Sequence, residues 1–550
     1  MTEHYDLIII GMGSGGIAAA EFAATLDLDV AVIERGRVGG TRLWAGCVPS
    51  KALLASAKAA HTIRHADEFG LHSVEPQIDL AMVWRRVRSV QAEIGRTDDD
   101  PSRYRNMGIT IVSGNGTITG PNEVTVASAD HTLVLEGSFI MLCTGSSPVV
   151  PEIEGLLDAG FLTSDQLFDL EAPPATMIIL GGGPVGVEMA QAFVRLGIGT
   201  TMLQRDHSIL PRDEPALVQM LTSTLRAEGV DVRLGAEPLR VTTDGSIRTV
   251  HASIDGKEHS FSAEGILVAT GRRANADALG LEQLGIEIGP AGVVVDGRGR
   301  TNVRSIYAVG DVAGRSHFTH SAAYEGVRAI RDMFFPGKGN VDDFMPWCTF
   351  TDPELAHAGL TITEAEAAFG DDVDVWQLDL AHNDRARTDS STNGAIVVVT
   401  TKGRIVGAHI LAPSAGEMIH ELALAIHHEM KISDISNLVH IYPTYATGIG
   451  QVAYESAFEK AQKLRWLMRR PGETSPDDAS SRDTSSRDVG LREVGLREVG
   501  MRGVGMRGVR RLLRVIEVFE SVDVAQRRKD EDARTNDRDG GDATTDNGNG

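Results

Sequence analysis

Two distant segments of the chain show the same order of apolar and polar positions. In the first segment, the apolar runs Tyr5–Ile10 and Val30–Glu34 predict strands, and Gly15–Leu26 between them predicts a helix. In the second segment the same strand, helix and strand are predicted over Thr176–Leu180, Val187–Leu196 and Thr200–Gln204. This order is typical of parallel strands joined by helices, and it therefore predicts an α/β fold.

A glycine-rich turn joins the first strand of each unit to its helix. The turns contain Gly11, Gly13 and Gly16 in the first unit, and Gly181, Gly183 and Gly186 in the second. In such turns the first glycine permits the sharp bend, the second lets the backbone approach a pyrophosphate, and the third lets the helix pack on the strand. Glu34 ends a strand, where a carboxylate accepts the ribose hydroxyls of an adenosine. Two units predict two nucleotides, or one nucleotide and one flavin.

The segment 39–51 reads GGTRLWAGCVPSK. It resembles the flavin-facing loop of the pyridine nucleotide–disulfide oxidoreductases, the family of dihydrolipoamide dehydrogenase, glutathione reductase and mercuric reductase. In that family two cysteines five positions apart form a disulfide beside FAD. Here Arg42 stands at the first position and only Cys47 remains. The resemblance implies FAD and NADPH or NADH as cofactors, and the lone sulfur predicts a changed electron acceptor.

The resemblance covers about residues 4–465 and implies two Rossmann-like domains plus an α+β dimerisation domain. We expect an FAD-binding domain over 1–150 and 276–338, an NAD(P)-binding domain over 151–275, and the dimerisation domain over 339–466. The resemblance also implies an obligate homodimer in which the dimerisation domain completes the partner's site. Residues 467–550 contain a five-residue repeat and predict a low-complexity, mostly disordered tail, with a short helix over 511–528.

The resemblance also implies contacts with each cofactor. Asp311 is expected at the ribityl or pyrophosphate region, and His317–His320 at the isoalloxazine edge, although His320 is equally an ordinary packed histidine. The expected FAD contacts are Gly11, Gly13, Gly16, Glu34, Thr41, Lys51, Gly116, Thr144, Gly145, Ser146, Gly310, Asp311 and His320. The expected contacts of the nicotinamide nucleotide are Gly181, Gly183, Gly186, Glu188, Gln204, Arg205, Gly271 and Arg272.

The choice between the two nicotinamide nucleotides depends on position 204. NADH-selective sites place a carboxylate there, whereas this chain has Gln204 followed by Arg205. Arg205, with His207, favours pairing with the 2′-phosphate of NADPH. The alternative is that Arg205 is a solvated surface charge and that NADH is the donor.

Five positions are candidates for the chemistry itself: Cys47, Lys51, Glu188, Arg42 and Tyr442. The resemblance implies that Lys51 pairs with Glu188 near flavin N5, where an ammonium favours the anionic reduced flavin; the alternative is two ordinary surface residues. Cys47 precedes Val-Pro-Ser-Lys, which predicts a helix start, and a thiol there favours the thiolate form. The alternative is an inert cysteine. By resemblance, the thiolate touches the flavin edge.

The C-terminal catalytic stretch of the family, roughly His-x-His-Pro-Thr-x-x-Glu, is altered. Here Tyr442 replaces the second histidine and Thr447 replaces the glutamate, so the acid–base dyad is lost together with the disulfide. A phenol is a poor base at neutral pH but donates a hydrogen bond. We expect Arg42 and Tyr442 on the acceptor side. Arg42 either attracts an anionic group or fills space and meets solvent, and Trp44 either stacks on a flat acceptor or packs in its loop.

The composition limits the partners and the compartment. The net charge is −23 and only nine of the 53 basic residues are lysine, which is typical of a halophile or of an arginine-rich, GC-rich genome. Nucleic acid and anionic membranes are poor partners for such a surface. No apolar run reaches the ~18 residues of a membrane span, so we expect a cytoplasmic protein.

The cysteines and histidines predict no metal site. Cys143 and Cys348 are expected to be small core residues, because no two cysteines have CxxC spacing. The histidines His420, His427 and His428 lack HExxH spacing and are expected at a helix surface or dimer interface. The absence of a second loop cysteine and of a vicinal cysteine pair speaks against mercury reduction.

The sequence favours hydride transfer from NAD(P)H through FAD to a small non-disulfide acceptor such as a quinone, as in a diaphorase. Three alternatives stay open. In the first, Cys47 cycles through a sulfenic acid or a mixed disulfide, as a single-cysteine thiol or peroxide reductase. In the second, the chain retains dihydrolipoamide dehydrogenase activity. In the third, the chain is a flavin-binding redox sensor or scaffold with little turnover.

Overall fold

The first sheet is built around β1 (Glu3–Ile10), in a computed structural model that describes residues 3–128, 131–337, 339–342 and 344–465. β1 lies between two parallel neighbours, with Ile9 opposite Val32 on one side and Met141 on the other. Leu7, Ile8 and Ile9 are fully buried because both faces of the sheet are covered, which explains the unbroken apolar run in the sequence. The other strands are β2 (Val30–Glu34), β3 (Thr110–Ser113), β4 (Asn115–Gly120), β5 (Glu123–Ala127), β6 (Thr132–Leu142) and, returning from far downstream to pair with β6, β16 (Ile306–Ala308).

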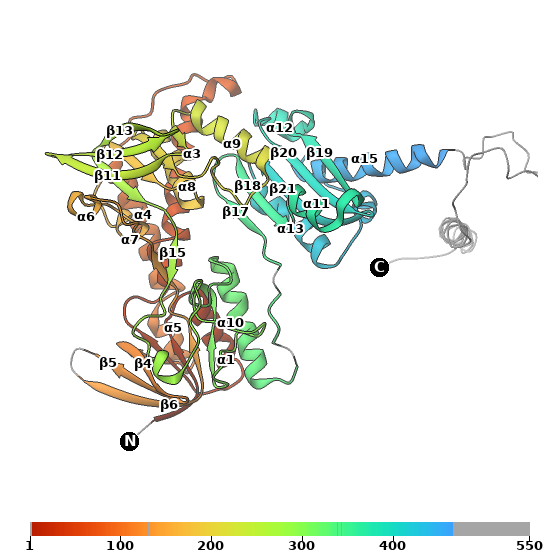
Figure 1. The fold of residues 1–550 in the computed structure, drawn as a ribbon. Coiled ribbons are helices and arrows are strands. Elements are labelled where there is room, and N and C mark those ends of the chain that lie inside the picture. The colour runs from red at the N-terminus through yellow and green to blue at the C-terminus, as the bar shows by residue number, and fades with distance from the viewer. Residues whose placement is uncertain (1–2, 129–130, 338, 343, 466–550) are drawn as a thin grey trace, which may run out of the picture. The chain divides into compact units, whose positions relative to one another are not determined.

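The second sheet repeats the parallel arrangement. Its strand order is β10-β9-β8-β14, and it is accompanied by an antiparallel sheet, β11-β12-β13 (Figure 1). The bounds are β8 (Thr176–Leu180), β9 (Gly199–Gln204), β10 (Asp231–Leu234), β11 (Glu237–Asp244), β12 (Ile247–Ile254), β13 (Lys257–Ala263) and β14 (Gly265–Val268). A two-stranded pair, β7 (Ser146–Pro148) with β15 (Arg272–Ala274), joins the two parts of the chain.

The third sheet is antiparallel throughout, in the order β17-β18-β21-β20-β19. Its buried residues form a core with the helices α13 (Ala415–His427), α14 (Ile432–Ser436) and α15 (Thr447–Lys463). The strand bounds are β17 (Trp347–Thr349), β18 (Glu354–Gly359), β19 (Val373–Asp379), β20 (Ala395–Thr401) and β21 (Arg404–Ala412). The change from parallel to antiparallel strands agrees with the α+β character predicted for this segment.

The helices agree with the predicted pattern and extend it. The predicted helix over Val187–Leu196 begins earlier, because Pro184 occupies the first helical position, where its fixed φ is favourable. The helix bounds are α1 (Ser14–Ala24), α2 (Gly40–Trp44), α3 (Cys47–Arg64), α4 (Leu80–Thr97), α5 (Pro101–Asn106), α6 (Leu156–Ala159), α7 (Ser164–Leu167), α8 (Pro184–Arg195), α9 (Pro215–Ala227), α10 (Thr319–Phe334), α11 (Ile362–Phe369), α12 (Asp384–Thr388), α13 (Ala415–His427), α14 (Ile432–Ser436) and α15 (Thr447–Lys463).

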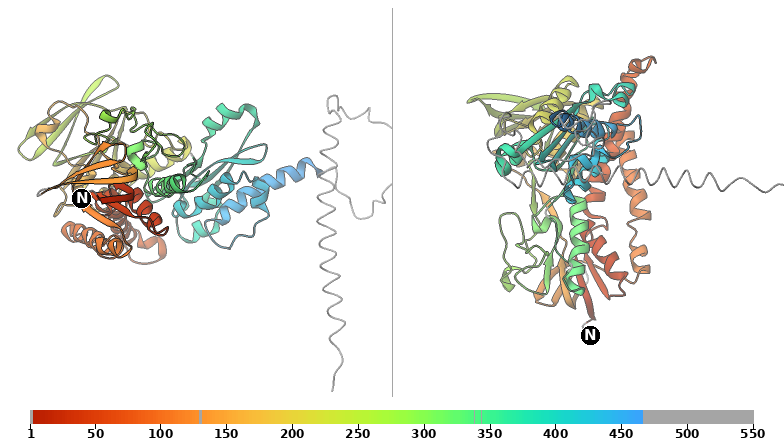
Figure 2. Two further views of the ribbon diagram at one scale, coloured as in Figure 1. Left: turned by 90° about the horizontal axis from the view of Figure 1, so that it is seen from below. Right: turned by 90° about the vertical axis from the view of Figure 1, so that its right-hand side faces the viewer.

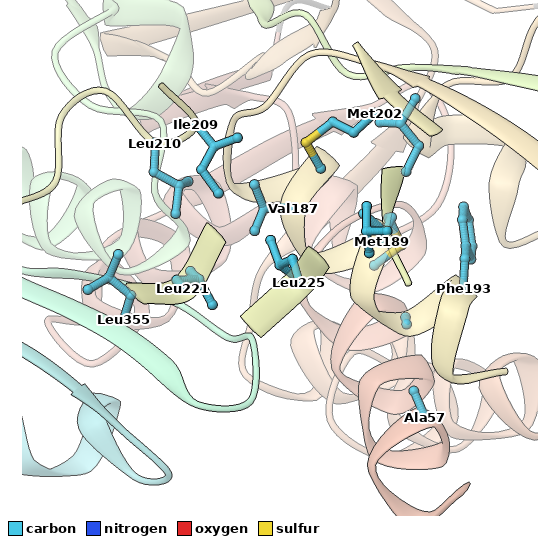
Figure 3. Close-up of a cluster of buried hydrophobic side chains, with 14 of the residues drawn as sticks. Ala57, Val187, Met189, Phe193, Met202, Ile209, Leu210, Leu221, Leu225 and Leu355 are labelled. Atoms are coloured by element: carbon cyan, nitrogen blue, oxygen red, sulfur yellow. The ribbon is translucent and has the colours of Figure 1, made fainter. Parts of the chain in front are cut away.

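One apolar cluster packs the second and third sheets around α3 and α8. It runs from Ala57 on α3 through Phe193 on α8 and Leu225 on α9 to Leu355 on β18 (Figure 3). On one face of the first sheet, α1 and α10 lie side by side (Figures 1 and 2). A Cβ at Gly326 would come within 2.6 Å of the Gly15 carbonyl oxygen. Helix α10 therefore brings its N-terminal residues next to the first glycine turn. The tail repeat and the helix predicted over 511–528 lie outside the described residues.

Two buried histidines face each other across the third sheet and predict a measurable acid sensitivity. His357 on β18 lies opposite His409 on β21, and burial lowers the pKa of His357 to about 3 and that of His409 to about 4. Below pH ~6.5 the unfolded chain binds protons at these two histidines, whereas the native protein does not. The free energy of unfolding therefore decreases as the pH falls below ~6.5. Each histidine should cost about 2 kcal/mol of stability near pH 5.

The measurement is the unfolding free energy between pH 8 and pH ~4.5. The double variant His357→Gln/His409→Gln should lose stability less steeply over this range than the native protein, and the exposed control His72→Gln should not alter the slope. An unchanged slope in the double variant would contradict the buried, neutral state of the pair.

Candidate functional site

A large cavity, of about 1960 Å³, collects most of the predicted site residues. Both glycine turns, the loop around Cys47, and parts of the third sheet line it. The predicted residues on its wall are Gly11, Gly13, Glu34, Thr41, Arg42, Cys47, Lys51, Gly116, Thr144, Gly145, Ser146, Gly181, Gly183, Glu188, Gln204, Arg205, Gly271, Arg272, Gly310, Asp311 and His320. Gly16 and Gly186 lie behind the turns, where a Cβ would come within 2.0 and 2.1 Å of the Gly11 and Gly181 carbonyl oxygens.

The two turns have nearly identical geometry and fit a dinucleotide pyrophosphate. Gly11 and Gly181 adopt φ of +102° and +109°, a left-handed backbone that favours glycine. At Gly13 an added Cβ would meet no atom closer than 3.8 Å, and at Gly183 none within 4 Å, so the backbone there is open to a ligand. Glu34 accepts hydrogen bonds from the amides of Met12 and Gly36, both at 2.7 Å, which fixes its carboxylate at the turn.

Gln204 occupies in the second unit the place that Glu34 holds in the first. Its Oε1 accepts from the Gly182 amide at 2.8 Å, and its Nε2 donates to Asp206 at 3.0 Å. Arg205 and His207 are both exposed, but in the described part of the chain only Arg205 lines the cavity, whereas the His207 ring lies beside Gly235. Of the two predicted phosphate partners, only Arg205 therefore lies on the cavity wall.

Lys51 and Glu188, 137 residues apart in sequence, form an ion pair on the cavity wall. The Lys51 Nζ lies 2.9 and 3.0 Å from the two Glu188 oxygens, and the Glu188 side chain is only 6% exposed. The Phe350 amide donates to Glu188 at 3.0 Å, and the Phe350 ring lies 4.3 Å below the ammonium. The pair joins α3, α8 and the third sheet, so it is a fixed element of the site rather than two separate surface residues.

Cys47 is the first residue of α3 and its side chain is exposed to the cavity. Its Sγ lies 3.3 Å from Oγ1 of Thr319, the first residue of α10. Thr319 lies within the range His317–His320 that was expected at the isoalloxazine edge, but the sequence did not indicate its contact with Cys47. Burial raises the pKa of the Cys143 and Cys348 thiols, so Cys47 is the accessible thiol among the three free cysteines. Cys348 is half-buried: it packs against the core of the third sheet, as predicted, and also lines the cavity.

The predicted flavin-side residues form a connected polar group. Ser146 donates to Asp311, and Arg272 Nε donates to Ser146 Oγ at 2.7 Å and lies 3.8 Å from Asp311. Thr144 Oγ1 donates to the Asn275 carbonyl at 2.7 Å. Arg272 thus lies beside Asp311, because the β7–β15 pair brings it to the first sheet. His320 lines the cavity and contacts the Pro346 carbonyl through Nε2 at 2.9 Å.

The loop that carries Arg42 and Trp44 is held by side-chain contacts. Arg42 Nη2 donates to the buried Asp99, a partner that the sequence did not indicate. Trp44 donates from its indole nitrogen to the Val38 carbonyl at 2.8 Å, which supports the loop-packing alternative for this residue.

Tyr442 does not line the cavity of its own chain. It is 69% exposed, and its hydroxyl donates to Asp384 on α12 at 2.9 Å, a contact that raises the pKa of the phenol. Its neighbours Val439 and Ile441 are 90% and 80% exposed. The single chain therefore exposes an apolar surface to solvent at this position. His440 contacts Glu421 at 3.0 Å, and Thr447 donates within its own turn to the Thr444 carbonyl.

Other expectations concern metals, membranes and the remaining histidines. The described residues contain no group of three or more metal-binding side chains, and none of their helices is long and apolar enough to cross a membrane. On α13, His420 lines the cavity, and His427 lies 3.0 Å from Asp342.

Two dinucleotide turns that open on one cavity, with a thiol and a Lys–Glu pair between them, define a two-nucleotide oxidoreductase. Residues 5–326 match the family described as pyridine nucleotide-disulphide oxidoreductase, and residues 345–453 match its dimerisation domain. The chain belongs to the pyridine nucleotide-disulphide oxidoreductases. This confirms the predicted family and fold class, and it makes the chain an FAD-containing, NAD(P)H-dependent oxidoreductase.

Individual relatives have different named activities. The chain is 33% identical to a mercuric reductase of Bacillus cereus, over 81% of this chain and 70% of the relative, and 34% identical to a dihydrolipoyl dehydrogenase of Chlamydia muridarum, over 81% and 95%. Among solved structures, the Cu(II) complex of the HOCl-induced flavoprotein disulfide reductase RclA from Escherichia coli is similar, with a TM-score of 0.74 and 26% identity over 83% of this chain and all of that one. The dimerisation-domain match supports the predicted homodimer.

Proposed function

We propose that this protein transfers electrons from NAD(P)H through FAD to a small non-disulfide acceptor, and that a quinone is the best candidate. The observation that carries the proposal is the pair of residues in the redox loop. Cys47 is an accessible thiol without a neighbouring cysteine in its loop, and Arg42, at the first cysteine's position, is bonded to Asp99. A single sulfur cannot hold the two electrons of a dithiol, so electrons leave the site by another route.

The proposed reaction balances without any sulfur chemistry. NAD(P)H gives up a hydride, which carries two electrons and one proton, and becomes NAD(P)+. The quinone takes two electrons and two protons, of which the second comes from solvent, and becomes the hydroquinone. FAD supplies the ability to accept a hydride and release electrons. The residues of this chain bind and orient the two reactants and set the charge around them.

We assign the roles of these residues as follows. FAD would be held by the first turn with Glu34 and by the group around Ser146 and Asp311. The nicotinamide nucleotide would be held by the second turn with Gln204 and Arg205. Lys51, held by Glu188, places a positive charge where negative charge develops on hydride arrival. Thr319 can donate a hydrogen bond to the Cys47 sulfur and so orient it in the cavity.

Tyr442 is assigned to the site of the partner subunit in a homodimer. Its exposure, together with that of Val439 and Ile441, supports a second copy covering this surface. Because the phenol proton is directed to Asp384, the phenol oxygen can accept a hydrogen bond from a bound hydroquinone. Asp384 would therefore be a positioning residue for Tyr442.

Substitution of the lone thiol is the test of the electron route. Cys47→Ala is expected to retain quinone reduction within about threefold of the native turnover, since the sulfur does not carry the electrons. The measurement is steady-state kcat with menadione and NADPH or NADH. The control is Ser223→Ala, which changes an exposed residue of α9 that does not line the cavity. Complete loss of activity in Cys47→Ala alone would favour the single-cysteine thiol or peroxide reductase instead.

The choice of nucleotide has its own prediction. Removal of the Arg205 charge in Arg205→Leu should lower kcat/KM for NADPH by roughly tenfold and leave that for NADH within about twofold, because only NADPH carries a 2′-phosphate. The comparison of both donors under one acceptor measures this ratio. An equal change with both donors would show that Arg205 does not read the phosphate.

A further inference from the structure

The guanidinium of Arg42 is held at one end by a buried carboxylate. Arg42 Nη2 donates to Asp99 Oδ2, and the Asp99 side chain is 3% exposed. The other oxygen of Asp99 accepts from the Tyr104 hydroxyl at 3.3 Å, and Tyr104 is fully buried. The carboxylate is thus fixed by α5, and it fixes the arginine in turn.

The rest of the guanidinium faces the cavity without a protein partner. Arg42 lines the cavity and its side chain is 28% exposed. In the described part of the chain, Asp99 is its only hydrogen-bond acceptor, which leaves most of the five N–H donors available. Arg42 is on α2, five residues before Cys47 in the sequence, and both residues line the cavity.

We infer that Arg42 forms an anion subsite in the acceptor pocket, and that the acceptor is a quinone that carries a carboxylate or sulfonate group. This inference rests on the function proposed above and specifies its substrate class. Asp99 is then a positioning residue for Arg42.

Two physical arguments support an anionic acceptor. A guanidinium offers parallel N–H donors that match the two oxygens of a carboxylate or sulfonate, and its anchoring by Asp99 removes conformational freedom before the ligand arrives. In addition, a chain with a net charge of −23 repels anions at long range, so a fixed local cation is needed for such an acceptor to bind. A neutral quinone would need no such residue.

The test compares two acceptors, a naphthoquinone that bears a ring sulfonate and uncharged menadione. Arg42→Gln should lower kcat/KM for the sulfonate by roughly tenfold or more, and should change that for menadione by less than about twofold. Arg42→Lys should keep part of the preference. Asp99→Asn retains an oxygen acceptor but removes the opposing charge, so the preference for the sulfonate should stay or rise. Arg96→Gln, which removes an exposed charge away from the cavity, is the control.

A binding measurement separates this inference from the proposed function. The dissociation constant of the sulfonate for the oxidised holoenzyme should rise with Arg42→Gln, and should rise with salt in the native protein but hardly in the variant. If neither acceptor is turned over but the binding difference persists, the quinone function fails and the anion subsite stands. Equal losses with both acceptors, or equal sulfonate affinity in native protein and Arg42→Gln, would overturn the inference. Thermal unfolding of each variant verifies that it is folded.

Discussion

Lys51→Met is expected to slow the reduction of the bound flavin by NAD(P)H about a hundredfold. The ammonium is held within 3.0 Å of both Glu188 oxygens, and Glu188 is in turn fixed by the Phe350 amide. Such a preorganised charge stabilises developing negative charge without reorganisation, and removal of one group of this kind typically costs 10²–10³ in rate. Methionine preserves the length of the side chain and its packing on Phe350, so the loss should come from the charge. Anaerobic stopped-flow absorbance measures the rate directly.

Lys58→Met provides the matched control. Lys58 lies on the same helix, α3, and pairs with Asp352 at 3.1 Å, but it does not line the large cavity. Its substitution should leave the rate of flavin reduction within about twofold. If Lys51→Met and Lys58→Met reduce flavin at the same rate, the Lys51–Glu188 pair has no part in hydride transfer.

Arg195→Met should destabilise the folded protein by about 3 kcal/mol, the lower end of the range for breaking a buried ion pair. The Arg195 side chain is 4% exposed, and it binds Glu228 through two bonds of 2.7 Å and Asp352 at 2.8 Å. Its removal leaves Glu228 buried and without its cation, while Asp352, which is a quarter exposed, keeps Lys58. The measurement is the unfolding free energy in denaturant, with the flavin bound in all samples.

Arg273→Met is the control for Arg195→Met, because it breaks an ion pair that is exposed rather than buried. Arg273 and Asp277 form an ion pair in which both side chains are about 70% exposed, and such pairs contribute little. Its loss should change stability by less than about 0.5 kcal/mol. Similar destabilisation in the two variants would show that Arg195 is not the buried link between α8 and the third sheet.

The periodic and glycine-based parts of the fold were predictable from the sequence. Strand Val30–Glu34 and the turn at Gly11 follow from local rules, because buried parallel strands require continuous apolar residues and a left-handed turn requires glycine. The third sheet was expected only through the family resemblance. Its antiparallel pairing joins β18 to both β17 and β21, and no local pattern specifies which distant strands pair.

The partners of the site residues were not predictable. Asp99 lies 57 residues from Arg42, Asp384 lies 58 residues from Tyr442, and Thr319 lies 272 residues from Cys47. A carboxylate or hydroxyl in a polar segment has no sequence pattern that distinguishes a buried partner from a solvated surface group. Only the fold brings these residues together.

The central claim is that electrons pass from the flavin to the acceptor without a dithiol relay. The most direct measurement is an anaerobic titration of the purified holoenzyme with dithionite, with the number of electrons counted per flavin. We expect reduction to be complete after about two electrons per flavin, the capacity of FAD alone. Uptake of about four would reveal a second two-electron centre, such as a disulfide formed by Cys47 with another sulfur, and would contradict the account.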